Sequence, residues 1–451
     1  MKINTVIFKA YDIRGLYPEE INEGAAYLVG RAFVEFLNKK DLKIVISRDN
    51  RPSSPALFEA LVRGLIEGGA DVVNIGLSST PMFYFAVSYF KCDGGITITA
   101  SHNLNPWNGF KLVREKAIPL SAETGIFWLK DFLVKERFFR LAKNKGKIVK
   151  KNIAKIYIDF NLKLARVKRG EFKGLSLAID AGNGAGGPIA LKLLKETGIK
   201  VYPIFCRPDG SFPNHPPDPL IKENLKFIVS LIKKKKEIFG AAFDGDGDRI
   251  IFIDERGEVI SGDLITALMA KIILKNNSKS KILYDVRSGR IVKETIKKEG
   301  GIPISSQIGH ALIKEEMRKK DILFGGELSG HYYLGRKLFY EVPFFVLLNI
   351  LKEIKKRNAS LSYLVEDYKK YFHSGEINFK VANKEEKIKE LKTRFKGGKI
   401  SELDGLRVDF RDWWLLVRPS NTEPVLRLVI EAKTKELLAE KKKVLTDIIL
   451  H

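Results

Sequence analysis

The chain has 451 residues, of which 45% are hydrophobic and 29% are charged, a balance that excludes a disordered or collagen-like protein. Its 79 Lys and Arg residues outnumber its 54 Asp and Glu residues, which gives a formal net charge of +25. This excess favours anionic ligands such as phosphorylated metabolites or nucleic acid. A chain of this length exceeds what one hydrophobic core usually supports, so we expect about three or four domains.

The cysteine content and the apolar runs bear on the cellular setting. Cys92 and Cys206 are too few for a disulfide framework, and the sequence has no C-x-x-C spacing. The first residues lack the apolar core of a signal peptide, and the most apolar run, residues 342–348, is shorter than a membrane span. We therefore expect a cytoplasmic protein without a membrane partner.

Three stretches of the chain share one plan, in which a β-branched run ends in a polar loop and a segment of helical periodicity follows. The runs with their loops are residues 43–49, 175–182 and 281–287. Glycine closes each helical segment, where we expect the left-handed stop of a helix. These glycines are Gly68 and Gly69, Gly198, and Gly300 and Gly301. A second strand is then predicted at 72–75, 201–205 and 302–305.

A third strand follows in each unit, and its end differs in chemistry each time. The third strands with their end loops are residues 95–103, 240–249 and 322–331. The strand-helix-strand order predicts mixed, mostly parallel sheets covered by helices, because parallel strands need crossover connections. Ligands of such sheets bind outside the carboxyl ends of the strands, so we expect functional sites at these three loops.

From about Tyr371 the pattern changes to that of a smaller domain. A helix is predicted at 385–396, strands at 413–417 and 426–431, and an amphipathic helix from Lys435. The predicted fold class is α/β, with three tandem similar α/β domains and a smaller C-terminal α+β domain. We place the domains at residues 1–145, 150–254, 257–368 and 371–451.

The loop after the third strand of the first unit, residues 99–111, reads T-A-S-H-N-L-N-P-W-N-G-F-K. Ser101 follows the strand directly, with His102 and Asn103 behind it, and can be a nucleophile or a phosphate carrier. A serine hydroxyl needs a positive or basic neighbour for either task. The alternative is an ordinary cap at a strand-to-helix turn.

In the second unit the loop carries Asp244, Asp246 and Asp248, separated by glycines. Carboxylates this close repel one another, and a divalent cation such as magnesium or calcium relieves the repulsion. An EF-hand is excluded because Arg249 stands where that loop needs glycine, and because strands rather than helices are predicted on both sides. A solvated acidic turn is the remaining alternative. We favour magnesium.

The third unit ends in Glu327, Ser329 and His331. Together these side chains can hydrogen-bond vicinal hydroxyl groups and move a proton. A purely structural histidine is the alternative reading.

The loop at 418–424 in the C-terminal domain offers one guanidinium, two hydroxyls and an amide. These groups belong to Arg418, Ser420, Asn421 and Thr422. The set suits a phosphate dianion, although the same residues are also typical of a generic turn.

Gly182, Gly184 and Gly187 satisfy G-x-G-x-x-G after a predicted strand, which would indicate a dinucleotide site and an oxidoreductase. The acidic residue expected near the end of the next strand is absent, because Cys206 and Arg207 stand there. We do not favour this alternative. A nucleic-acid-binding protein that uses the net charge is a further alternative, although the basic residues are mostly scattered lysines.

Taken together, the loops resemble the α-D-phosphohexomutase superfamily, specifically its bacterial phosphomannomutase/phosphoglucomutase branch. The resemblance covers essentially the whole chain, with five motifs in that family's order. These are the N-terminal signature at 8–15, the phosphoserine loop at 99–111, the magnesium loop at 244–249, the sugar loop at 326–331 and the phosphate loop at 418–424. It implies four domains around a central cleft and an isomerase that moves a phosphoryl group between C1 and C6 of a hexose phosphate.

The resemblance also implies roles for individual residues. Ser101 would carry the phosphate, and Ser101, Asp244, Asp246 and Asp248 would hold Mg²⁺. The catalytic set would be Ser101, Lys111, His331, Arg14 and His102, with Lys111 and His331 as candidates for proton transfer. Substrate would contact Tyr11, Arg249, Arg287, His310, Glu327, Ser329, Arg418, Ser420, Asn421 and Thr422. A bisphosphorylated hexose would be the intermediate, with glucose 1,6-bisphosphate or an equivalent as activator.

Two residues depart from the family's pattern. Leu104 replaces the proline that usually follows T-A-S-H-N, and Arg287 stands where a lysine is common. Neither change affects the expected nucleophile or the metal ligands, so we expect activity. Thr99 and Leu328 are unlike the phosphoglucosamine branch. The expected partners are small hexose phosphates and no specific nucleic acid, and the sequence leaves mannose and glucose open.

Overall fold

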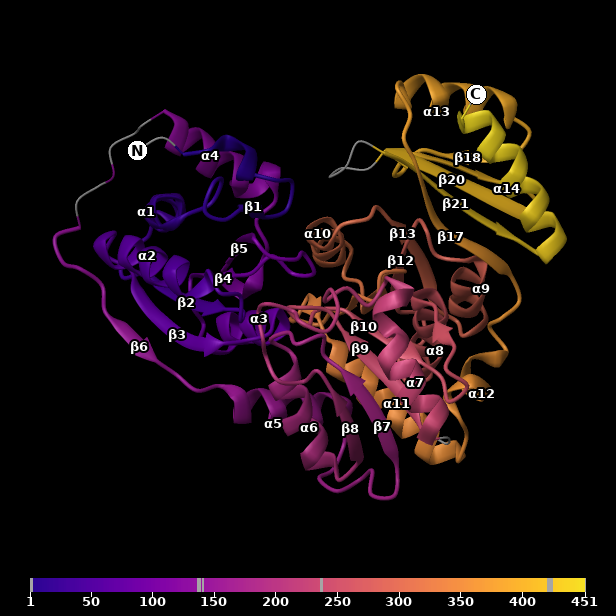
Figure 1. The fold of residues 1–451 in the computed structure, drawn as a ribbon, viewed down its shortest axis with the longest axis horizontal. Coiled ribbons are helices and arrows are strands. Elements are labelled where there is room, and N and C mark those ends of the chain that lie inside the picture. Colours follow the sequence, from indigo (N-terminus) through magenta and orange to yellow (C-terminus); the bar gives the residue numbers. More distant parts are fainter. Residues whose placement is uncertain (1–2, 136–138, 140–141, 236–237, 420–424, 451) are drawn as a thin grey trace.

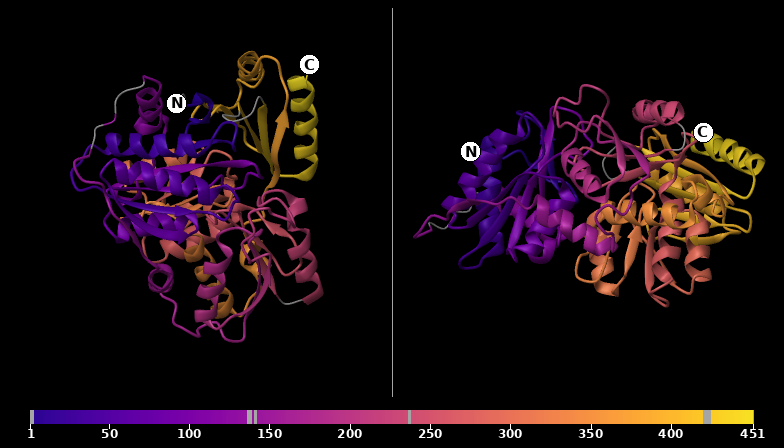
Figure 2. Two further views of the ribbon diagram at one scale, coloured as in Figure 1. Left: turned by 60° about the vertical axis from the view of Figure 1, so that its left-hand side comes forward. Right: turned by 90° about the horizontal axis from the view of Figure 1, so that it is seen from below.

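The computed structural model describes residues 3–135, 139, 142–235, 238–419 and 425–450. Four sheets follow one another along the chain, each with its own helices (Figure 1). In Figure 1 the first unit lies at the left and the fourth at the upper right, and the second and third units lie below the fourth; Figure 2 gives two further views. We call these units one to four in chain order.

Unit one has a six-stranded sheet in the order β1-β5-β4-β2-β3-β6. Its strands are β1 (Ile13–Leu16), β2 (Lys43–Arg48), β3 (Asp71–Leu77), β4 (Gly94–Ile98), β5 (Trp107–Arg114) and β6 (Ile148–Lys150). Its helices are η1 (Thr5–Ile7), α1 (Glu23–Leu37), α2 (Ser54–Glu67), α3 (Thr80–Tyr89), η2 (Glu115–Ala117), η3 (Ala122–Ile126) and α4 (Phe127–Val134). Strand β2 is parallel to β3 and β4, whereas β5 is antiparallel to β4 and β1.

Unit two orders its strands β11-β10-β9-β7-β8. They are β7 (Ser176–Asp180), β8 (Lys200–Ile204), β9 (Phe239–Phe243), β10 (Ile250–Ile253) and β11 (Val259–Ile260). The helices are α5 (Ala154–Ala165), α6 (Gly187–Thr197), η4 (Lys222–Leu225) and α7 (Lys226–Lys235). Parallel pairing joins β7 to β8 and β9, and an antiparallel hairpin joins β9 to β10.

Unit three repeats this topology in the order β13-β12-β14-β15-β16. Its strands are β12 (Lys281–Asp285), β13 (Ile302–Ser306), β14 (Phe324–Gly326), β15 (Tyr332–Leu334) and β16 (Tyr340–Glu341). Its helices are α8 (Gly262–Leu274), α9 (Arg290–Lys298), α10 (His310–Lys320), α11 (Pro343–Arg357) and α12 (Leu361–Glu366). The glycines expected to stop the helical segments do so, because Gly69, Gly198 and Gly300 all have positive φ angles.

Unit four is an antiparallel sheet in the order β17-β21-β20-β19-β18, with two helices. The strands are β17 (Phe372–Phe379), β18 (Lys399–Ser401), β19 (Leu406–Asp409), β20 (Trp413–Pro419) and β21 (Leu426–Ala432), and the helices are α13 (Lys384–Arg394) and α14 (Lys435–Leu450). The predicted fold class, three similar α/β units and a smaller C-terminal α+β unit, is therefore confirmed.

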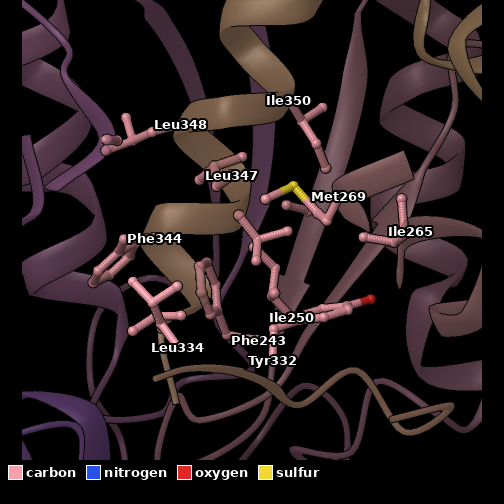
Figure 3. Close-up of a cluster of buried hydrophobic side chains, with 14 of the residues drawn as sticks. Phe243, Ile250, Ile265, Met269, Tyr332, Leu334, Phe344, Leu347, Leu348 and Ile350 are labelled. Carbon is pink, nitrogen blue, oxygen red and sulfur yellow. The ribbon is translucent and has the colours of Figure 1, made fainter. Parts of the chain in front are cut away.

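Units two and three share one hydrophobic core, to which α3 of unit one also contributes. Phe243 and Ile250 of unit two meet Phe344 and Leu347 of α11 in this core (Figure 3). Apolar burial on this scale favours a fixed relation between the two sheets, because separating them would expose the whole cluster to water. The site loops at the ends of these sheets are thereby held in register.

Unit four has its own core and docks on unit three through polar contacts and a small apolar cluster, made of Val286 and Ile308 of unit three and Trp414, Leu416 and Val429 of unit four. The Arg290 guanidinium donates hydrogen bonds to the backbone carbonyls of Arg411 and Trp413, at 2.7 and 2.8 Å. The Glu431 carboxylate accepts from the Arg290 backbone N–H at 3.1 Å and from the Trp414 indole at 2.7 Å. These charge-assisted bonds orient β20, which leads to Arg418.

Replacement of Phe344 tests the shared core. Phe344 is 2% exposed, and its ring centroid lies 5.7 Å from that of Phe243. Phe344→Ala should lower the free energy of unfolding by about 3–5 kcal/mol, because it removes buried apolar contacts and leaves a cavity. Urea denaturation followed by circular dichroism measures this change. Phe227→Ala, at a site that is 40% exposed, is the control, and equal midpoints for the two variants would contradict the account.

Candidate active site

Ser101 lies in the loop that follows β4, at the carboxyl edge of the first sheet. Its backbone is in the left-handed region, with φ of 51°, and the residue is 5% exposed. Thr99 Oγ1 accepts a hydrogen bond from the Ser101 backbone N–H at 2.9 Å, and Arg51 Nη2 donates to its carbonyl oxygen at 2.8 Å. A non-glycine residue in this conformation needs such support, and strained backbone of this kind is typical of functional sites.

The three aspartates occupy the turn between β9 and β10, and all are buried. One ligand oxygen from each lies within 4.8 Å of the others. The Asp244 Oδ1 atom accepts from the backbone N–H groups of Asp248 and Arg249 at 3.1 and 3.2 Å, which fixes the turn. Ser101 Oγ lies 3.1 Å from Asp244 Oδ2. The serine of unit one therefore meets the acidic loop of unit two.

Close backbone approach explains the glycines of this region. A Cβ atom on Gly245 would lie 2.5 Å from the Ser101 carbonyl oxygen, and one on Gly184 would lie 2.5 Å from the Gly245 carbonyl oxygen. Side chains cannot fit at either position. The glycine-rich turn at 182–187 therefore packs directly behind the acidic loop, and this packing accounts for its sequence without a dinucleotide.

Lys111 of β5 balances part of the acidic charge. Its Nζ atom lies 2.6 Å from Asp246 Oδ2 and 2.7 Å from Asp248 Oδ2, and the residue is buried. Burial alone would lower the pKa of Lys111, but the two carboxylates raise it well above its usual value. Burial and the neighbouring carboxylates raise the pKa of Asp244, whereas Lys111 and His331 hold that of Asp248 well below its usual value despite burial.

The donor set fits a hard divalent cation. Three buried carboxylates lie together, two of them share the Lys111 ammonium group, and the buried Asp246 Oδ1 atom has no hydrogen-bond partner among the described residues. A buried carboxylate oxygen without a partner is costly, and coordination would satisfy it. Within the described part of the chain, this is the one cluster of three or more His, Cys, Asp or Glu residues able to hold a metal ion.

His331 joins unit three to this loop. Its Nε2 atom lies 3.2 Å from Asp248 Oδ1, and its Nδ1 atom lies 3.2 Å from Glu327 Oε2 and 3.0 Å from Ser329 Oγ. Burial alone would lower the pKa of His331, but Asp248 and Glu327 raise it to about 9. The pKa of Glu327 is lowered to about 2 by His331 and Arg287, in spite of burial. The carboxylates therefore favour the protonated histidine, and the histidine and Arg287 favour the ionised glutamate.

Arg249, His102 and Arg14 lie around Ser101. Arg249 is 3.8 Å from Asp244 and also contacts Asp218, at 3.7 Å. His102 Nδ1 is 3.4 Å from Ser101 Oγ, and Arg249 together with burial lowers the pKa of His102 well below its usual value. Arg14 donates to Asn103 Oδ1 at 2.5 Å. The His102 imidazole thus lies against the serine, and the guanidinium groups of Arg249 and Arg14 contact the neighbouring Asp244 and Asn103.

Tyr11 and His310 join unit one to unit three, with ring centroids 5.9 Å apart. Burial lowers the pKa of His310 well below its usual value. The pKa of Tyr11 is raised by burial and responds to the charges of Arg418 and Glu327 as well. Tyr11 therefore shares its surroundings with the sugar loop and with unit four.

Arg287 and Arg418 meet at Glu376 of β17, at 3.9 and 3.5 Å. Both guanidinium groups belong to buried residues, and Arg287 also lies 2.7 Å from Asp285. Arg427 contacts the same carboxylate at 2.9 Å, so three guanidinium groups gather around Glu376 at the border of units three and four. Ser420, Asn421 and Thr422, the other members of the predicted phosphate loop, lie outside the described residues.

Sequence reasoning missed three residues of this site. Arg51 supports the Ser101 carbonyl oxygen, and Glu376 contacts Arg287, Arg418 and Arg427. Thr80, at the start of α3, donates from its hydroxyl to Asp246 Oδ2 at 2.5 Å and from its backbone N–H to the Asp246 carbonyl oxygen at 2.9 Å. The Ser79-Thr80-Pro81 helix start was a usable signal for Thr80, because it follows the second strand at the same sheet edge.

No described helix combines the length and apolar character needed to cross a membrane.

Comparison with known proteins gives a consistent result along the chain. Family models described as phosphoglucomutase/phosphomannomutase alpha/beta/alpha domains I, II and III match residues 5–137, 155–257 and 261–371. The model of that family's C-terminal domain matches residues 376–447.

Individual relatives match over nearly their full length. A phosphomannomutase of Methanocaldococcus jannaschii is 40% identical over 445 residues, which cover 98% of this chain and 97% of that protein. A phosphoglucomutase of Neisseria gonorrhoeae is 37% identical, with 95% and 93% covered. The crystal structure of a phosphoglucomutase/phosphomannomutase family protein from Burkholderia thailandensis is 32% identical, has a TM-score of 0.90, and is matched over 99% of this chain and 97% of that one.

Replacement of one aspartate tests the cation site. Asp246→Asn should weaken Mg²⁺ binding by about tenfold or more, because it removes a charge from the buried donor set. Titration calorimetry with MgCl₂ measures the affinity. Asp209→Asn, an exposed aspartate of the same unit, is the matched control. Unchanged affinity in Asp246→Asn would show that the acidic loop does not bind the cation.

Proposed function

Because the chain belongs to the phosphoglucomutase/phosphomannomutase family, we propose that it is a phosphohexomutase, an isomerase that interconverts hexose 1-phosphate and hexose 6-phosphate. Mannose and glucose phosphates are both candidate substrates, since relatives of similar identity carry either name. The single observation that supports this function best is the meeting of Ser101 Oγ with Asp244, 3.1 Å apart, in a buried loop cluster lined by Lys111 and His331.

The proposed reaction has two half-steps centred on Ser101. In the first, the bond between phosphorus and Ser101 Oγ breaks while a hydroxyl oxygen of the hexose phosphate bonds to phosphorus, and the hydroxyl proton passes to a base. The product is a bisphosphorylated hexose that turns over within the site. In the second, Ser101 takes the other phosphoryl group, and the sugar oxygen that is released receives a proton.

Lys111 and His331 are the proposed groups for proton transfer. Their carboxylate partners favour the protonated forms, which suits the half-step in which a sugar oxygen leaves and needs a proton. By microscopic reversibility, the deprotonated form of the same group accepts the proton in the opposite half-step. The proposed role of His102 and Arg14 is to border the serine oxygen and orient it.

The acidic loop would hold Mg²⁺ through Asp244, Asp246 and Asp248, together with the Ser101 phosphate. When bound, Mg²⁺ would spread the negative charge that develops on the transferring phosphoryl group. The guanidinium group of Arg249, at the end of the acidic loop, would stabilise the same negative charge on the phosphoryl group. Glucose 1,6-bisphosphate, or an equivalent, would restore the Ser101 phosphate after the intermediate has escaped.

Substrate binding would divide between the sugar loop and unit four. The ionised Glu327 can accept hydrogen bonds from sugar hydroxyls, with Ser329 beside it. Arg418 would hold the non-reacting phosphate, with Ser420, Asn421 and Thr422 as proposed partners and Arg287 nearby. Tyr11 and His310 would close the contact between units one and three around the sugar. A cytoplasmic setting and the absence of a specific nucleic-acid partner stay predictions.

The test of the proposed function is the Ser101→Ala variant. We expect a loss of about a thousandfold or more in kcat, because the group that carries the phosphate is removed while the fold is kept. Conversion of glucose 1-phosphate and of mannose 1-phosphate is assayed with Mg²⁺ and glucose 1,6-bisphosphate. Peptide mass spectrometry should find phosphate on Ser101 in the unaltered protein.

Ser211→Ala, at an exposed serine of unit two, is the control and should keep full activity. Full mutase activity in Ser101→Ala, or phosphate on another residue as the transferred group, would contradict the proposal.

A further inference from the structure

A groove of about 1600 Å³ lies between units two and three, on the side away from the Ser101 loop. It runs along α11 and is bordered by the end of α5, the end of α8 and the turn between β15 and β16. Leu323, at the amino end of β14, lines it, whereas the opposite end of β14 leads to Glu327. In Figure 1, α5 and α11 lie low in the molecule and unit four lies above. We call this feature the α11 groove.

The α11 groove is strongly basic. Nine Lys or Arg side chains line it against three Glu, which leaves a formal charge of +6. One of the acids, Glu353, is paired with Arg357 at 2.8 Å. The structure records no ion pair for the groove residues Arg166, Lys271, Lys275, Lys337 and Lys356 with any described residue. So many uncompensated cations around one hollow create a potential that attracts polyanions.

Part of this positive charge is held in place by backbone contacts. Lys352 Nζ donates to the Ala165 carbonyl oxygen at 2.9 Å, at the carboxyl end of α5, and Lys355 donates to the Glu171 carbonyl oxygen. These bonds tie α11 of unit three to α5 of unit two. They position the ammonium groups without neutralising them, because a carbonyl oxygen carries no net charge. These lysines of the groove wall are therefore held in position without a bound ligand.

The groove also has an apolar floor. Phe160 and Leu164 of α5, Ile272 of α8, and Leu338 and Phe345 line it and are half-buried. Inorganic phosphate or a hexose phosphate would leave this floor uncovered, and an apolar ligand would leave the cations without partners. A ligand that satisfies both has a flat apolar part and several negative charges. Sites at the junction of two units commonly bind ligands of this size.

We propose that the α11 groove binds a nucleoside triphosphate, with the base on the Phe160–Phe345 floor and the phosphates among the lysines of α8 and α11. Such a ligand spans units two and three and contacts both sides of their shared core. The site is separate from the phosphohexomutase centre, so occupancy of the groove does not require the active site. The proposal thereby gives part of the lysine excess in the sequence a role in ligand binding.

Binding is tested by titration calorimetry on the full chain with ATP in buffer containing EDTA. We expect one molecule of ATP per chain, bound about tenfold more tightly than tripolyphosphate, because the base adds apolar burial. Saturating glucose 1-phosphate should leave ATP binding unchanged. Equal affinity for tripolyphosphate, or competition by glucose 1-phosphate, would overturn the proposal.

Charge reversal locates the site. Lys275→Glu combined with Lys356→Glu should weaken ATP binding by about tenfold or more while mutase activity stays unchanged. The matched control is Lys233→Glu with Lys234→Glu on α7, exposed lysines outside the groove that change the net charge equally. If both double variants bound ATP equally weakly, the loss of affinity would come from the change in net charge alone, and the proposal would be overturned. Tighter binding of a single-stranded oligonucleotide than of ATP would overturn it in favour of nucleic acid.

Discussion

The structure depends on the compensation of buried negative charge at one turn. Asp244, Asp246 and Asp248 lie together on unit two, and among the described residues of that unit Arg249 is the cation that pairs with them, at 3.8 Å from Asp244. Lys111 comes from unit one and His331 from unit three, each within 3.2 Å of an aspartate oxygen. Isolated carboxylates in this environment would be costly, so the turn is stable only when the three units are assembled. The same arrangement puts Ser101, the proposed phosphate carrier, next to Lys111 and His331, the groups proposed for proton transfer.

The residues around Ser101 and the residue Arg418 are held in place by different parts of the packing. The shared core fixes units two and three, and α3 of unit one joins it, so the residues around Ser101 have a rigid support. Unit four has its own core and contacts unit three through arginine and glutamate hydrogen bonds and a small apolar cluster, which together orient the strand that leads to Arg418. Phosphoryl transfer needs a fixed geometry around the reacting oxygen. The proposed bisphosphate intermediate must also rotate within the site, which is easier when its second phosphate is held by a separate unit. The architecture is consistent with both requirements.

Features that depend on residues close together in the chain could be predicted from the sequence. The repeated strand-helix plan, the left-handed glycines such as Gly198, and the alternating aspartates each depend on neighbours in the chain, and the structure has them all. Contacts between units leave no such trace. Nothing near Arg51 in the sequence predicts that it binds the Ser101 carbonyl oxygen, and nothing near Glu376 predicts that three arginines contact it. The glycine-rich turn at Gly184 matches a dinucleotide-binding motif for the same reason. Its glycine is required by close packing against Gly245, which is distant in the sequence.

A crystal structure of the full chain with Mg²⁺ and glucose 1-phosphate tests the central claim most directly. The account predicts one cation held by the three aspartates and the Ser101 oxygen, with the sugar over Glu327 and its phosphate on Arg418. A cation elsewhere, or a sugar phosphate that contacts neither Arg418 nor the Ser101 loop, would contradict the convergence of these segments on one phosphate ester.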